Sequence, residues 1–99
     1  MRQRTVVLSP EAEDDLNRLY DWIAERAGPA VAIGYIERIE SFCARLDIAS
    51  ERGTARDDIR AGLRIVGFER RITVAFTVTS EAVQILRLFH GGSDWEANF

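Results

Sequence analysis

The only histidine of the chain, His90, is the first candidate for chemistry. It ends a strand-like apolar run, and Gly91 and Gly92 follow it directly. Imidazole gains and loses a proton near neutral pH, so a histidine at the open end of a strand can act as a general acid. The same position suits a partner contact or a hydrogen-bonded strand end. The residues alone leave these three roles open.

Arg71 is the predicted neighbour of His90. The short connection 79–82 joins the last two strand-like runs in a hairpin. If Val78 faces Val83 across this turn, regular pairing places Arg71 opposite His90 at the open end of the sheet. The hairpin would therefore bring a guanidinium beside the imidazole.

The same register divides the other side chains of the hairpin between two faces. Ile72 and Phe89 pair on the face that packs against helices, and Arg87 shares that face. A charge there must be paired, so we expect a salt bridge between Arg87 and an acid on a helix. Leu86 and Leu88 fall on the outer face, where they form an exposed apolar strip of the kind that a partner covers.

Two helices must support this hairpin. Residues 4–8 read as a strand, Ser9 can cap a helix, and Pro10 suits its first position. Gly28 and Pro29 end this helix and begin a second one, so the two helices form an antiparallel hairpin. Apolar residues recur at helical spacing in both segments: Ala12, Leu16, Leu19, Tyr20, Ile23 and Ala27, then Ala32, Tyr35, Ile36, Ile39, Phe42, Cys43 and Leu46.

The order of elements predicts an α+β fold. The periodicity fails between Ser50 and Gly62, which reads as a loop, and strand-like runs follow at 63–68, 71–78 and 83–90. We therefore expect a strand, an antiparallel helical hairpin and a three-stranded antiparallel meander, with the helices on one face. Residues 1–99 form one domain in this interpretation, and 91–99 form a flexible C-terminal tail.

The composition excludes several classes of function. The 99 residues are 46% hydrophobic and 29% charged, and the net charge of −3 argues against indiscriminate nucleic-acid binding. The single cysteine, Cys43, permits no internal disulfide and reads as a small core residue. No ligand cluster or glycine-rich loop indicates a metal or cofactor. No apolar run could span a membrane and no leader is evident, so we expect a cytoplasmic protein.

Three stretches of the sequence resemble the ParE/RelE superfamily of bacterial toxins: SPEAEDDLNRLYDWIAER, RDDIRAGLRIV and ILRLFHGGSDWE. The resemblance covers essentially the whole chain and is strongest to the ParE branch. It implies a RelE/ParE-like fold and the toxin of a type II toxin–antitoxin pair. It further implies a hetero-oligomer with a ParD-like ribbon-helix-helix antitoxin, and DNA gyrase as the target that the toxin poisons without catalysis of its own.

The RelE branch implies an alternative function, ribosome-dependent cleavage of mRNA. Such cleavage needs a base, a cation for the phosphorane charge and an acid for the leaving oxygen. Asp57 or Asp58 would be the base, Arg71 the phosphate clamp and His90 the acid. The absence of lysine and the negative net charge favour the gyrase poison. A non-toxic binding module is a third alternative.

Partner contacts are predicted at several exposed or chemically distinctive residues. Trp22 lies beside the apolar stripe of the first helix, where it is expected to pack against the neighbouring helix. Four arginines spaced every four residues from Arg52 are expected to form salt bridges with nearby aspartates. The full set of candidates is Trp22, Arg60, Arg64, Arg71, Leu86, Leu88, His90 and Trp95.

Overall fold

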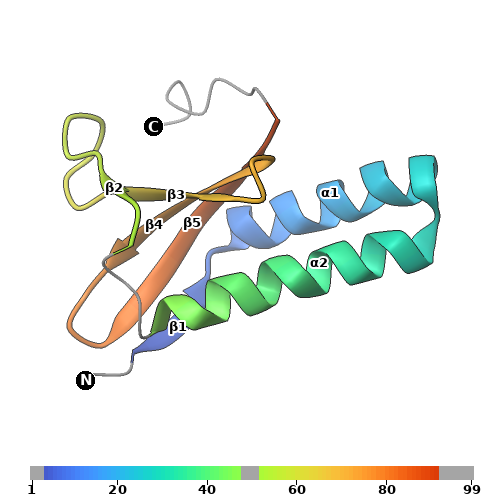
Figure 1. The fold of residues 1–99 in the computed structure, drawn as a ribbon. Helices are drawn as coiled ribbons and strands as arrows, with labels where there is room; N and C mark the ends of the chain where they lie inside the picture. Colours follow the sequence, from blue (N-terminus) through green and yellow to red (C-terminus); the bar gives the residue numbers. More distant parts are fainter. Residues whose placement is uncertain (1–3, 48–51, 92–99) are drawn as a thin grey trace.

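The protein is a two-layer α+β structure in which two helices cover one face of a five-stranded mixed sheet (Figure 1). The computed structural model describes residues 4–47 and 52–91. The sheet order is β1-β5-β4-β3-β2; β1 runs parallel to β5, and the other neighbours are antiparallel. The elements are β1 (Thr5–Leu8), α1 (Pro10–Ala27), α2 (Pro29–Ala44), the 3-10 helix η1 (Arg45–Asp47), β2 (Thr54–Ala55), β3 (Arg64–Phe68), β4 (Ile72–Val78) and β5 (Ala82–His90).

This arrangement confirms the predicted fold class and the order of its main elements. The structure adds the short strand β2 within the segment predicted to be a loop, and it shows that β1 joins the sheet beside β5. Trp95, like the rest of the predicted tail from residue 92 onward, lies outside the described residues. No helix in the described part of the chain is both long enough and apolar enough to cross a membrane.

The helical hairpin follows from local signals at its ends. The Ser9 Oγ accepts a hydrogen bond from the Ala12 N–H at 3.0 Å, and Pro10 occupies the first turn of α1. Gly28 adopts a φ of +93°, which a residue without a Cβ tolerates, and its N–H donates to the Ala24 carbonyl at 3.0 Å. The chain therefore reverses at one residue, and α2 returns along α1.

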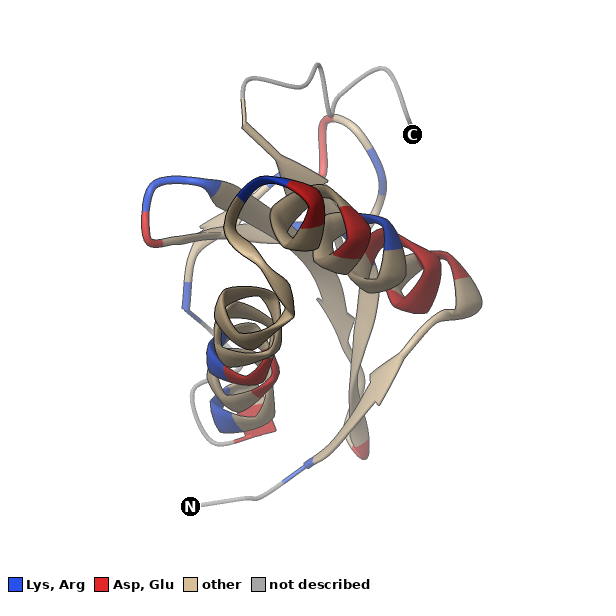
Figure 2. Cartoon of the chain, turned by 90° about the vertical axis from the view of Figure 1, so that its right-hand side faces the viewer, with Lys and Arg blue, Asp and Glu red and all other residues tan. Residues whose placement is uncertain are grey.

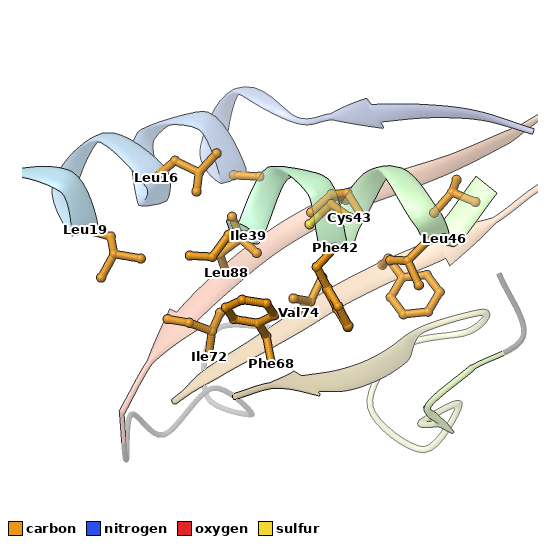
Figure 3. Close-up of a cluster of buried hydrophobic side chains, with 14 of the residues drawn as sticks. Leu16, Leu19, Ile39, Phe42, Cys43, Leu46, Phe68, Ile72, Val74 and Leu88 are labelled. Atoms are coloured by element: carbon orange, nitrogen blue, oxygen red, sulfur yellow. The ribbon is translucent and has the colours of Figure 1, made fainter. Parts of the chain in front are cut away.

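The hydrophobic core lies between the helices and the sheet, as Figure 3 shows. Leu16 and Leu19 of α1 and Ile39 and Phe42 of α2 meet the inner face of the sheet. Cys43 is buried among them at 2% exposure. Burial, with a smaller effect of Glu40, raises the pKa of the Cys43 thiol to about 12. Its assignment as a core residue is confirmed.

The turn between β3 and β4 is bound to α2 by an ion pair. Glu69 and Arg70 both have positive φ angles, a conformation that is unfavourable for residues with side chains. The Arg38 guanidinium donates to the two Glu69 oxygens at 3.1 and 3.2 Å, and this hydrogen bonding lowers the pKa of Glu69 against a smaller opposing effect of desolvation. This bidentate pair joins the second helix to the end of the sheet where β4 begins.

A β-bulge changes the predicted register of the last hairpin. Val78 faces Val83 and Phe76 faces Ile85 as predicted, but β5 then carries one extra residue between the partners of Phe76 and Ala75. Beyond it Ile72 faces His90 instead of Phe89. The predicted pairing of Arg71 with His90 is therefore wrong. Arg71 precedes β4, and its carbonyl accepts a hydrogen bond from the Gly91 N–H at 2.8 Å.

The bulge also exchanges the faces of the residues that follow it. Leu88 is 6% exposed and packs in the main core beneath the helices, whereas Phe89 turns to the outer face of the sheet. The predicted exposure of Leu88 on the outer face is wrong, and so is the placement of Phe89 on the helix side. One additional residue is sufficient because side chains alternate along a strand.

Part of the outer face of the sheet is covered by the chain itself. Leu63, Ala75 and Phe89 form a second, smaller cluster there, and the partly buried Ile59 packs against it. Leu86 also packs against this cluster instead of standing exposed. The predicted apolar strip therefore does not form, because Leu88 lies in the main core and Leu86 packs against the smaller cluster to which the segment between β2 and β3 contributes.

Candidate functional site

The free edge of β5 is where the first helix meets the sheet. β1 ends at Leu8, opposite Ile85, so the second half of β5 has no strand on this side among the described residues. The Ser9 N–H continues the ladder to the Ile85 carbonyl at 2.9 Å, and the Ser9 hydroxyl donates to the Leu86 carbonyl at 2.8 Å. The residues that start α1 thus replace the missing strand.

Asp15, six residues after Ser9 on α1, completes this replacement. Its carboxylate accepts a hydrogen bond from the backbone N–H of Leu88 at 2.9 Å. It also accepts from Arg87 Nε at 2.8 Å and Nη2 at 3.1 Å, and from Arg18 at 3.1 Å. Arg87 therefore pairs with a helix acid, as predicted. Its predicted place on the helix side is wrong, because the bulge sets Arg87 opposite Ala75 and beside the ring of Phe89, and it reaches Asp15 around the free edge of β5.

Asp15 is the one charged residue among the buried side chains that the structure describes, at 9% exposure. Burial by itself would raise the pKa of its carboxyl group. The hydrogen bonds from Arg87 and the Leu88 N–H, with the charge of Arg87 and a bond from Arg18, together outweigh burial and lower the pKa below its ordinary value. The carboxylate is thus held ionised at neutral pH.

A cleft of about 340 Å³ opens beside this network, between α1 and the ends of β4 and β5. It contains two arginines, one carboxylate, the only histidine, and an apolar lining with an exposed tryptophan. The residues that line it are Asp15, Arg18, Leu19, Trp22, Ile72, Arg87, Leu88, Phe89 and His90. Of the predicted partner-contact candidates, the structure brings Trp22 and His90 together here with Leu88.

Trp22 and His90 form the mouth of the cleft. Their ring centroids lie 4.5 Å apart with an interplanar angle of 63°, an edge-to-face contact. The Arg26 guanidinium lies 4.1 Å from the centre of the Trp22 ring, a cation–π distance. Trp22 is 43% exposed and contacts β5, which differs from the expectation that it packs against the neighbouring helix. The bulge explains this contact because it turns His90 to the helix side.

The three residues of the predicted ribonuclease set do not meet in one place. Asp57 lines a different hollow, together with Val78 and Thr79, at the far end of β4 from the cleft. The two ends of this seven-residue strand are about 20 Å apart at the usual rise per residue. Arg71 does not line the cleft that contains His90.

Asp57 and its neighbours instead hold the loop between β2 and β3. The Asp57 carboxylate accepts a hydrogen bond from the Gly62 N–H at 2.9 Å. Arg56 forms a bidentate pair with Asp58 at 2.9 and 3.0 Å, which confirms the expected salt bridge for this arginine. Arg64 donates to backbone carbonyls of Arg52 and Gly53, and Arg60 is exposed on the loop. These contacts assign a local structural role to the segment.

A second candidate surface is the groove between the two helices and β1. Its volume is about 450 Å³, and acidic residues border an apolar floor. The lining residues are Leu8, Glu13, Leu16, Asn17, Tyr20, Ile36 and Glu40. Figure 2 shows the acidic residues in red along the helices, with short blue stretches between them. In the ranges 4–47 and 52–91 no three His, Cys, Asp or Glu side chains gather closely enough to hold a metal ion.

The salt bridge predicted for Arg87 named no particular helix acid, and Asp15 was not identified. Asp15 is one of four acidic residues near the start of α1, where negative charge is also favoured by the helix dipole. The available signal was its spacing, because Asp15 lies three residues after Ala12 and four before Leu19, on the buried stripe. An acid on the buried stripe of a helix requires a cation, and Arg87, which is partly buried on β5, provides it.

Comparisons with known proteins agree with this architecture. A family described as the ParE toxin of type II toxin–antitoxin systems, parDE, matches residues 6–95. Toxin ParE3 of Caulobacter vibrioides is 33% identical over 86 residues, which cover 87% of this chain and 85% of that protein.

A solved structure described as the chromosomal ParDE TA system from P. aeruginosa has the same fold. Its TM-score is 0.78 at 24% identity, and the match covers 90% of this chain and 97% of that one. The sequence match spans both helices and all but the first residue of the sheet. On this evidence the chain belongs to the ParE toxin family of type II toxin–antitoxin systems.

Proposed function

We propose that this ParE-family toxin arrests growth by poisoning DNA gyrase, and that a ParD-like ribbon-helix-helix antitoxin neutralises it. The observation that carries the choice of mechanism is the separation of Asp57 from His90 at opposite ends of β4. Family membership supplies the toxin class. The geometry favours a toxin that acts by binding.

Catalysis of RNA cleavage requires a base, a cation and an acid around a single phosphate. The His90 ring packs against Trp22, and a carboxylate oxygen of Asp57 accepts a hydrogen bond from the Gly62 N–H. His90 and Asp57 cannot act on one phosphate, because the length of β4, about 20 Å, separates them. A binding role for the Trp22–His90 cleft requires no such assembly.

The groove between the helices and β1 suits the antitoxin. β1 is an edge strand of the sheet, and the adjoining groove offers the apolar side chains of Leu16, Tyr20 and Ile36. A segment that orders along this groove would bury apolar area and contact the edge of the sheet. We expect a total interface on the order of 2,000 Å² or more, the size of permanent complexes.

Expression from a tightly controlled promoter tests the mechanism. We expect growth arrest with an induced DNA-damage response and intact mRNA, and we expect co-expression of the antitoxin to restore growth. DNA damage and mRNA integrity must be measured in the same culture. Ribosome-dependent mRNA fragments without a DNA-damage response would refute the gyrase mechanism and support the RelE-type alternative.

A pair of variants tests the antitoxin surface. Asn17 is exposed and lines the groove, so Asn17→Trp should fill the groove without disturbing the core. We expect this variant to remain toxic and to escape neutralisation. Val31→Trp is the matched control, because Val31 is an exposed residue of α2 that does not line the groove. Equal neutralisation of both variants would exclude the groove.

A further inference from the structure

We infer that the Trp22–His90 cleft is a second docking site, which takes an acidic segment of a protein partner in which an acidic residue adjoins an aliphatic or aromatic one. This inference goes beyond the proposed function because it states which chemical class of ligand the cleft binds. It does not depend on whether gyrase is the target. The cleft is also chemically unlike the groove, whose border carries Glu13 and Glu40.

The charges that line the cleft leave a positive excess. Among the residues that line the cleft, Arg18 and Arg87 are opposed by a single carboxylate, that of Asp15, while the charge of Glu11 acts on Arg87 from outside the lining. Asp15 already accepts four hydrogen bonds, so it has little capacity for a further cation. The Arg26 guanidinium lies on the Trp22 ring at the mouth, where it also pairs with the exposed Glu25 at 4.0 Å.

The two arginines keep donors that the carboxylate does not use. Arg87 engages Asp15 through Nε and Nη2, and its Nη1 makes no hydrogen bond to any described residue. Arg18 engages Asp15 through Nη2 alone, and its side chain is 72% exposed. Guanidinium groups fixed in this way bind a carboxylate with little further loss of side-chain freedom.

The rest of the cleft favours a neighbouring apolar side chain. Leu19, Ile72 and Leu88 form part of its lining, and Trp22 stands half-exposed at the mouth. Tryptophan and arginine are the residues that most often carry the binding energy of protein interfaces. An acid beside an aliphatic or aromatic residue would place its carboxylate on the arginines and its neighbour against the apolar lining.

A protein segment fits this site better than a nucleic acid does. α1 exposes acidic side chains at Glu11, Asp14, Asp21 and Glu25, and the chain carries a net charge of −3. A phosphate backbone crossing the cleft would continue past these acids and be repelled. A short peptide segment needs only the cleft itself.

A displayed library of random octapeptides, selected on the immobilised full-length protein, tests the inference. We expect the enriched sequences to contain Asp or Glu next to Leu, Phe, Trp or Tyr. A synthetic peptide of the leading sequence should bind at least about tenfold more tightly than its Asn/Gln counterpart, because charge-assisted hydrogen bonds would be lost. Equal binding of both peptides, or no enrichment of acidic sequences, would overturn the inference.

Three variants locate the binding. Arg18→Gln and Trp22→Leu change exposed side chains, so both should fold and should each weaken the peptide about tenfold. Arg45→Gln removes an exposed arginine outside the cleft and should leave binding unchanged. Equal loss in Arg45→Gln would show a non-specific charge effect and refute the site. An octamer of thymidylate that binds the cleft more tightly than the peptide would assign it to nucleic acid instead.

Discussion

The carboxylate of Asp15 on α1 and the guanidinium of Arg87 on β5 form a bidentate pair, at 2.8 and 3.1 Å, at the free edge of the sheet. The same carboxylate accepts a hydrogen bond from the Leu88 N–H, so it neutralises the charge of Arg87 and also satisfies a backbone donor at the open strand edge. An unpaired N–H at this edge would favour association with other chains. The pair therefore fixes α1 against the half of β5 that β1 does not reach.

Replacement of Asp15 by asparagine should destabilise the protein by about 3 kcal/mol, because Arg87 loses the counter-charge to which it is bound. The amide retains the size of the side chain, so packing is preserved. The free energy of unfolding in urea, measured by circular dichroism, checks this expectation. Asp14→Asn on the exposed face of α1 is the control and should change the free energy by less than about 0.5 kcal/mol.

The stability of the protein should fall in acid partly through Asp15. Its pKa is lowered in the folded state, so its contribution is present above the ordinary aspartate pKa and is lost as the pH falls through the folded value. The loss should therefore occur below about pH 4. Asp15→Asn should flatten the curve of unfolding free energy against pH in this range. An unchanged slope would mean that other carboxylates dominate acid unfolding.

The bulge predicts different costs of truncation for two leucines of β5, Leu86 and Leu88, which are separated by one residue. Leu88 lies in the main core at 6% exposure, and Leu88→Ala should cost about 3 kcal/mol through lost contacts and the cavity left behind. Leu86 is only partly buried, so Leu86→Ala should cost less. Urea unfolding of both variants is the measurement. Equal costs would contradict the register described for the second half of β5.

His90→Gln distinguishes the two toxin mechanisms. A glutamine keeps a polar side chain of similar reach, so a gyrase poison should retain much of its toxicity. A ribonuclease would lose its acid, and cleavage should fall about a hundredfold or more. Growth, mRNA integrity and DNA damage after induction of the variant provide the comparison. Loss of toxicity together with loss of mRNA fragments would contradict the binding mechanism.

The helices were predictable because their signals are local. Ser9, Pro10 and Gly28 stand where capping and helix termination require them, and the apolar spacing of α1 and α2 gives the buried faces. The turn between β4 and β5 also follows from its length, and the pairs adjacent to it are as predicted. Each of these features depends on residues within a few positions of one another.

The candidate site was less predictable because it depends on contacts between distant residues. Trp22 and His90 are 68 positions apart in the sequence, and Asp15 and Arg87 are 72 apart, so both contacts arise only from the fold. No local pattern marks the bulge, since Leu86, Arg87 and Leu88 continue an ordinary strand sequence. The predicted partner role of Trp22 and His90 remains a prediction, although the structure places the two rings in contact.

The extra residue in β5 also has a consequence for sequence comparison. A relative that lacks the bulge would have one residue fewer in the middle of this strand, and its equivalent of His90 would align only across a gap there. Alignment methods normally avoid gaps within strands, and an ungapped alignment would match inward-facing positions to outward-facing ones beyond Leu86. The histidine at the end of β5 should therefore be compared between relatives by structural superposition, because its sequence position alone does not fix its side of the sheet.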